Sequence, residues 1–251
     1  MKRSITLTLL LASCGVHAGT MGPVATPSTQ FFVSGEGGYT WNQLDGANFT
    51  VTPGFNIYTK NDNQGGTARV ASGVMHPLMN NALAVSAELG WGYYGHTRFK
   101  FSAIGLPAAA VANLNNAIKV NTYLNGFDVL AGLIYNINPQ FDVFAKTGAL
   151  IENSRTTLNL DASVLGASSR LTIRTNETQA LPAIKLGGSY HIMENLSLFA
   201  SWTHAFGDNN DTSGLTSSAT IQNLLGSANL SVNQRNPTLD VAMAGLQYNF
   251  S

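Results

Sequence analysis

The chain has 251 residues and a net formal charge of zero, and only 10% of its residues are charged, well under the roughly 25% of an average soluble domain. A hydrophobic content of 44% with 25 glycines argues against a disordered tail, and the balanced charge argues against a basic nucleic-acid-binding protein. The single cysteine, Cys14, excludes a disulfide framework.

The first eighteen residues, 1–18, have the pattern of a secretory signal peptide. Lys2 and Arg3 precede an apolar run from Ile5 to Ala12, which is too short to span a membrane as a helix. A small residue at Ala18 then favours cleavage after that position. An alternative stays open, because the residues leading to Cys14 also fit a lipidation box that would leave this cysteine acylated.

The mature chain is predicted to begin with a flexible lead-in, residues 19–29, followed by one domain over residues 30–251. Gln30 to Trp41 alternates between apolar and small or polar residues, as a strand with one buried face does. Residues 42–66 are rich in Asn, Asp, Gly and Thr and predict a long loop. Beyond the signal, no apolar run approaches the length of about 18 residues that a membrane helix needs.

Three predicted hairpins follow, each with a short turn that contains asparagine. They join 67–78 to 82–94, 120–137 to 141–151, and 180–192 to 196–206, and a last strand runs to Phe250. The connections between hairpins are long and polar: 95–119, 152–179 and 207–237. Strict alternation of short turns and long loops is typical of outer-membrane barrels. The count predicts an all-β, eight-stranded, antiparallel, up-and-down transmembrane barrel with both termini on the periplasmic side.

The two faces of each predicted strand differ as a membrane barrel requires. The outward face of residues 82–94 is apolar, with Leu83, Val85, Leu89 and Trp91, while the inward face is mostly small. A soluble sandwich would instead place charged residues freely on its solvent face. Predicted outward aromatic residues also gather near the two ends of the strands, as expected for rings at two membrane interfaces.

Six charged residues are predicted to point into the barrel near mid-strand: Glu36, Arg69, Glu88, Asp128, Lys146 and Lys185. An eight-stranded barrel leaves room for little more than side chains, and unpaired charges there would be strongly disfavoured. We therefore expect three acids and three bases to pair and plug the interior. A larger or gated pore is the alternative if segments such as 97–101 and 170–175 form additional strands.

The sequence gives little support for an enzyme or a metalloprotein. The candidate histidines, His76, His96, His191 and His204, are dispersed without a neighbouring nucleophile motif, and no pair of His or acidic residues has ligand spacing. We therefore predict no catalytic, metal-binding or cofactor-binding residues and no cofactor.

The end of the chain resembles the C-terminal insertion signal of Gram-negative outer-membrane barrels. Gly245 precedes the alternate aromatics Tyr248 and Phe250, although Ser251 follows where the family usually ends on the aromatic. The resemblance implies recognition by the barrel assembly machinery. The hexapeptide from Gly19 to Val24 also resembles the start of the major-outer-membrane-protein group of intracellular bacteria.

The expected location is the outer membrane of a Gram-negative cell, with the long loops facing the exterior. The expected role is structural or cell-surface interaction, with passive diffusion of small solutes as the alternative. Expected partners are outer-membrane lipid, the assembly machinery and a host or surface ligand at the loops. No nucleic acid is expected, because the central parts of the long loops carry little charge.

Overall fold

The computed structural model describes residues 28–43, 48–51, 55–62, 64–78, 82–104, 109, 112, 115–116, 118–161, 170–207 and 238–250. The expected signal peptide and most of the lead-in (1–27) lie outside these residues, as does nearly all of the connection 207–237. The ten strands of the described part are β1 (Gln30–Gln43), β2 (Asn48–Val51), β3 (Phe55–Asp62), β4 (Gln64–Pro77), β5 (Leu83–Ile104), β6 (Ile118–Asn138), β7 (Phe141–Asp161), β8 (Arg170–Met193), β9 (Leu196–Ala205) and β10 (Thr238–Phe250). No helix in these ranges is long and apolar enough to cross a membrane.

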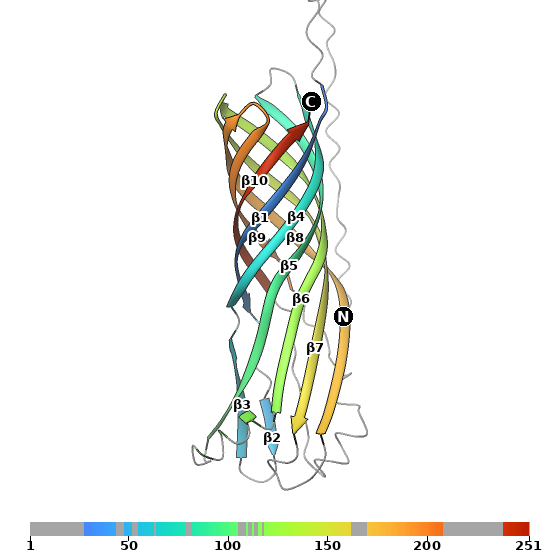
Figure 1. The fold of residues 1–251 in the computed structure, drawn as a ribbon, viewed down its shortest axis with the longest axis vertical. Coiled ribbons are helices and arrows are strands. Elements are labelled where there is room, and N and C mark those ends of the chain that lie inside the picture. The colour runs from blue at the N-terminus through green and yellow to red at the C-terminus, as the bar shows by residue number, and fades with distance from the viewer. Residues whose placement is uncertain are drawn as a thin grey trace, which may run out of the picture.

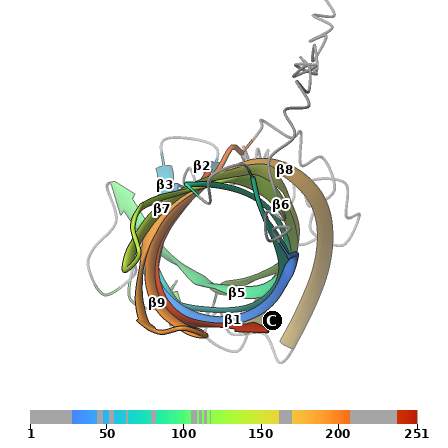
Figure 2. The ribbon, with the colours of Figure 1, turned by 90° about the horizontal axis from the view of Figure 1, so that it is seen from above.

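Eight of the described strands close into an antiparallel barrel, which confirms the predicted fold class. Neighbours around the ring are β5, β4, β1, β10, β9, β8, β7 and β6, and pairing of β6 with β5 closes the ring, as Figure 2 shows from above. The first and last strands, β1 and β10, pair with each other along the seam of the barrel, with Phe31 opposite Phe250 and Thr40 opposite Val241. Closure leaves the barrel wall without an unpaired edge.

The two ends of the barrel differ. At the turn end, β6 joins β7 and β8 joins β9 through two-residue turns, and the Gln140 amide donates to Asn138 Oδ1 at 2.9 Å. The start of β1 and the end of β10 also lie at the turn end, where Phe31 pairs with Phe250. At the opposite, loop end, β5 to β8 continue far beyond the other four strands, as the lower part of Figure 1 shows.

The strands are longer than predicted, so three expected loops are partly wrong. Residues 42–66 contain β2 and β3, and β3 pairs with the far end of β5. The predicted connections 95–119 and 152–179 supply the extensions of β5, β7 and β8. Segments 97–101 and 170–175 therefore lengthen barrel strands rather than adding strands to the ring. Strand β3 and the loop-end parts of β5 to β8 together form what we call the projecting sheet. These parts lie on the loop side of Tyr93 in β5, Tyr123 in β6, Ile151 in β7 and Ala180 in β8.

An apolar belt surrounds the outside of the barrel. Exposed aliphatic residues such as Val70, Leu89, Val129 and Leu186 occupy its middle. Exposed aromatic rings flank it towards the turn end (Phe31, Tyr135, Phe141, Tyr190, Tyr248, Phe250) and the loop end (Tyr39, Trp41, Trp91, Phe127, Trp202, Phe206). So large an exposed apolar surface belongs against lipid rather than water.

Candidate functional site

The middle of the lumen holds a compact ion-pair cluster, and it contains all six inward charges that the sequence singled out. Arg69 lies at its centre. Strand β4 pairs with β1, and this register sets Arg69 directly opposite Glu36. Its guanidinium binds Asp128 through two nitrogens, with Nε donating to Oδ2 at 2.7 Å. It also contacts Glu36 through Nη1 and donates from Nη2 to Glu88 Oε1 at 2.8 Å. One arginine therefore joins three acids that come from three different strands.

Two lysines complete the balance of charge. Lys146 Nζ donates to Glu88 Oε2 at 2.5 Å, and Lys185 Nζ donates to Glu36 Oε1 at 2.8 Å. Lys185 also lies 3.5 Å from Glu88 Oε1. All six side chains are almost fully buried, and three acids against three bases give the cluster no net formal charge. Pairing of this kind offsets the large cost of removing charges from water.

Neighbouring side chains hold the cluster in place, and sequence reasoning missed most of them. Tyr94 donates its hydroxyl to Asp128 Oδ2 at 3.1 Å. The Lys146 ammonium lies 5.3 Å from the ring centroid of Phe32 and 5.0 Å from that of Phe144. These cation–π contacts add favourable electrostatics on the sides of the ammonium that face no acid. The alternation of inward and outward residues could have identified Phe32 and Tyr94 as facing the lumen, but nothing in the sequence indicated which side chains they contact.

An apolar layer fills the lumen on the loop side of the cluster. Leu124, Leu150 and Leu181 each precede or follow a cluster residue by about four positions on the same inward face, and each is at most 3% exposed. Other members of the layer are Tyr94, Ala183, Ala205, Leu239, Val241 and Met243, and Leu130, which pairs in register with Glu88, belongs to the same buried cluster. This layer was not predicted from the sequence, because Leu150 adjoins the outward Ile151 and an apolar pair hides the alternation.

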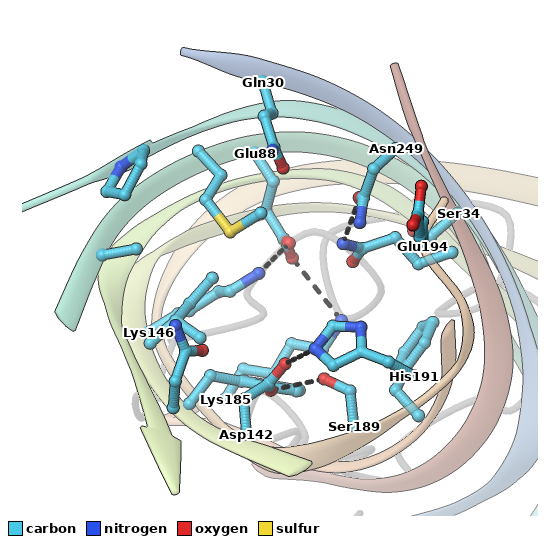
Figure 3. A pocket seen from close by; sticks show the side chains of 18 of the residues that line it. Gln30, Ser34, Glu88, Asp142, Lys146, Lys185, Ser189, His191, Glu194 and Asn249 are labelled. Carbon is cyan, nitrogen blue, oxygen red and sulfur yellow. Dashed lines mark hydrogen bonds and ion pairs between the residues drawn. The ribbon is translucent and has the colours of Figure 1, made fainter. Parts of the chain in front are cut away.

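A cavity of about 410 Å³, lined by both polar and apolar side chains, occupies the turn side of the cluster, shown in close-up in Figure 3. Glu88, Lys146 and Lys185 form its inner boundary, so the cluster separates the cavity from the apolar layer. The remaining wall is formed by Ser28, Gln30, Ser34, Met75, Pro77, Ala84, Ile134, Asn136, Asp142, Phe144, Ser189, His191, Glu194, Phe199, Gln247 and Asn249. The lumen is thus open at one end and packed at the centre.

A short hydrogen-bonded chain crosses the wall of this cavity. His191 Nε2 lies 2.9 Å from Asp142 Oδ2, its Nδ1 lies 2.7 Å from Ser197 Oγ, and Ser189 donates to Asp142 Oδ1 at 2.5 Å. The residue types match those of a nucleophile, base and acid set. Ser197, however, is only 1% exposed and does not line the cavity, so its hydroxyl cannot reach a substrate there. These hydrogen bonds instead hold the cavity wall in place at the turn end of the barrel.

The other candidate histidines lie apart from one another. His76 contacts Thr29 Oγ1 at 3.0 Å, His96 stacks on Tyr123, and His204 lies 2.8 Å from Asp240 Oδ1 on the outer surface. Across the described ranges, no three His, Cys, Asp or Glu side chains come together as a metal site would require.

The predicted insertion-signal residues lie on both faces of β10. Tyr248 and Phe250 point outward at the turn-end belt, with ring centroids 5.0 Å apart in an edge-to-face arrangement. Gly245 points inward, where a Cβ would come within 2.8 Å of Glu36 Cα on β1. Its lack of a side chain is therefore a packing requirement of the seam.

Residues 40–251 match the family model of the OmpA-like transmembrane domain. A comparison with curated protein sequences found no match.

Solved structures with a similar outline share little sequence with this chain. The attachment invasion locus protein Ail of Yersinia pestis is 14% identical over 87% of this chain and 98% of its own, with a TM-score of 0.40. OprG from Pseudomonas aeruginosa is 12% identical over 90% and 97%, with a TM-score of 0.47. Neisserial surface protein A is 16% identical over 88% and 97%, with a TM-score of 0.36. The structural likeness is weak in each case.

Proposed function

Because the chain belongs to the OmpA-like transmembrane domain family, we propose that it is a closed outer-membrane barrel with a structural or cell-surface interaction role. The chain lies in the outer membrane of a Gram-negative cell, where its apolar belt faces lipid. In this proposal the turn end faces the periplasm and the projecting sheet faces the exterior. Solutes do not pass through the lumen.

The observation that carries the proposal is the filling of the lumen. Six charged side chains with no net charge meet at its centre, linked through Arg69, and an apolar layer lies next to them on the loop side. A hydrated ion would have to separate buried ion pairs and then cross a layer that is apolar apart from the Tyr94 hydroxyl, both of which cost several kcal/mol. Support for a surface role comes from β5 to β8, which extend well beyond the lipid-facing belt.

The second candidate is passive diffusion of small solutes, and the cavity of about 410 Å³ favours it because the turn end of the lumen is already open. Liposome swelling with small sugars and single-channel recording on the purified barrel separate the two. We expect neither swelling nor a large, stable conductance, with a general porin as positive control in the same lipid. Steady sugar uptake that depends on the folded barrel would replace the closed-barrel proposal with the porin.

Several narrower proposals go with this function. We propose that residues 1–18 are removed by cleavage after Ala18, that 19–29 form a flexible lead-in and that 30–251 form the barrel domain. Gly245, Tyr248 and Phe250 would present the insertion signal to the barrel assembly machinery. The resemblance of Gly19 to Val24 to the major-outer-membrane-protein group remains a proposal, because that hexapeptide lies outside the described residues. A host or surface ligand at the loop end would be the partner.

A further inference from the structure

The lysines and arginines of this chain are distributed unevenly. Of the thirteen, three lie in the ion-pair cluster, and Lys2, Arg3 and Arg235 lie outside the described residues. The remaining seven all lie on the projecting sheet: Lys60, Arg98, Lys100, Lys119, Arg155, Arg170 and Arg174. The described outer surface of the barrel between the aromatic belts therefore carries no lysine or arginine, and the sheet beyond it carries seven.

The strand register places these seven positions on one face. Arg155 has the same parity as the exposed Ile151 on β7, and Lys119 has the same parity as the exposed Phe127 on β6. Cross-strand pairs extend the face: Lys60 with Lys100, Arg98 with Asn121, Lys119 with Asn159, Arg155 with Asn176, Thr157 with Arg174, and Asp161 with Arg170. Residues of one parity share a face of a sheet. This outward side is called the basic face below.

The basic face is positive and accessible. Arg98, Lys119, Arg155 and Arg174 are exposed. Among the described strand positions, the register places two acidic positions, Asp62 and Asp161, on the same face as the seven basic ones. Glu152 and Glu177 lie on the opposite parity, and Glu152 is buried. Of the charged residues on this face whose side chains the structure describes, four are basic and one, Asp161, is acidic, so the described part of the face is positive.

We propose that the basic face binds the phosphate-bearing headgroups of lipids in the leaflet on the loop side. The face is a direct continuation of the lipid-facing belt on the same strands. Arg155 follows the exposed Ile151 by four residues, a distance of roughly 13 Å along the strand, so its guanidinium reaches the headgroup layer. Arginines that can bind a phosphate through two nitrogens alternate with Asn and Thr side chains that suit sugar hydroxyls.

Lipid is favoured over a soluble polyanion because of where the face points. Each strand continues its lipid-facing side, so the basic residues look sideways over the membrane rather than towards its exterior. Headgroups of neighbouring lipids lie beside the part of the face nearest the belt, at high local concentration. The proposal rests on the proposed function only in requiring that the barrel span the membrane with this end in a leaflet of phosphorylated lipid.

The test uses purified full-length barrel in zwitterionic detergent, titrated with fluorescent lipopolysaccharide in its phosphorylated form and after dephosphorylation. The neutralised variant is R98Q/K119Q/R155Q/R174Q, and the matched control is the charge-conserving R98K/K119R/R155K/R174K. All must show the heat-dependent gel shift of a folded barrel. We expect the neutralised variant to bind the phosphorylated lipid at least about tenfold more weakly, because each cation near an anionic surface contributes favourably. The control should bind within about threefold of wild type.

Equal binding by wild type and neutralised variant, or equal binding of both lipid forms by wild type, would overturn the proposal. Heparin serves as the soluble polyanion. If wild type bound heparin more tightly than lipid and the neutralised variant lost that binding, the partner would be a soluble polyanion and the lipid proposal would fail. Conductance measured on the same preparations tests the closed lumen separately, so failure of either idea can be told from failure of the other.

Discussion

The cations of this barrel lie in two environments that differ in burial, pairing and net charge. In the lumen, Arg69, Lys146 and Lys185 are buried and matched by an equal number of acids within a few ångströms. On the basic face, seven basic positions stand against two acidic ones, and every cationic side chain that the structure describes there is exposed. The difference indicates that the inner cations hold the barrel together, whereas the outer ones are free to bind something else.

Replacement of Arg69 by methionine should have the largest effect. Methionine is similar in length but leaves Glu36, Glu88 and Asp128 buried with less positive charge than they need. Loss of one partner from a buried ionic network costs about 3–5 kcal/mol, so we expect a loss of that size in the free energy of unfolding. Urea unfolding in lipid vesicles, followed by tryptophan fluorescence, measures it. A loss below about 1 kcal/mol would show that the cluster does not stabilise the barrel.

The inner and outer faces can be compared with the same substitution at the β1–β10 seam. Gly245→Ala places a methyl group against the backbone of β1, and we expect it to cost about 1–3 kcal/mol as other overpacked sites do. Gly35→Ala is the matched control, since nothing lies within 4 Å of a Cβ on the outward side. It should stay within about 0.5 kcal/mol of wild type. Similar costs at the two positions would mean that the seam has room on both faces.

The sequence predicted the membrane part of the fold better than the part beyond it. Eight strands and the inward charges followed from strict alternation, as between Leu89 and Glu88, where only one face meets lipid. The extensions were missed because residues such as Asn153 to Thr157 are polar on both faces, so no alternation marks them as strand. The projecting sheet, with its seven bases, was therefore assigned to loops.

The partners within the lumen could not have been predicted from the sequence. Pairing of Arg69 with Asp128 joins residues 59 positions apart that are not neighbours in register, and it depends on how the tilted strands close around the lumen. Alternation shows that Arg69 and Asp128 both point into the lumen, but it does not show at which level along the barrel axis each one lies. The apolar layer was hidden for a different reason, since Leu150 and Ile151 are apolar on both faces of the same strand.

Tyr94→Phe tests the support of the cluster at smaller cost. The change removes the hydroxyl that donates to Asp128 and keeps the ring in the apolar layer. Asp128 retains both bonds from Arg69, so we expect a loss of about 0.5–1.5 kcal/mol in unfolding free energy. Double-mutant analysis with Arg69→Met should show coupling, because both residues bind the same carboxylate. Full additivity of the two losses would argue that Tyr94 acts only through packing.

The smallest effect on stability should come from the basic face, even though four charges are removed at once. R98Q/K119Q/R155Q/R174Q changes exposed side chains, and Arg155, the one among them with a described hydrogen bond, donates to Asn176 Oδ1 at 3.3 Å. We expect the unfolding free energy to change by no more than about 0.5 kcal/mol at moderate salt. At low salt the variant should equal or exceed wild type, because removal of like charges relieves repulsion that salt otherwise screens. A large loss at every salt concentration would place these cations in the same class as Arg69, as structural partners rather than a binding surface, and would remove the distinction between the two environments.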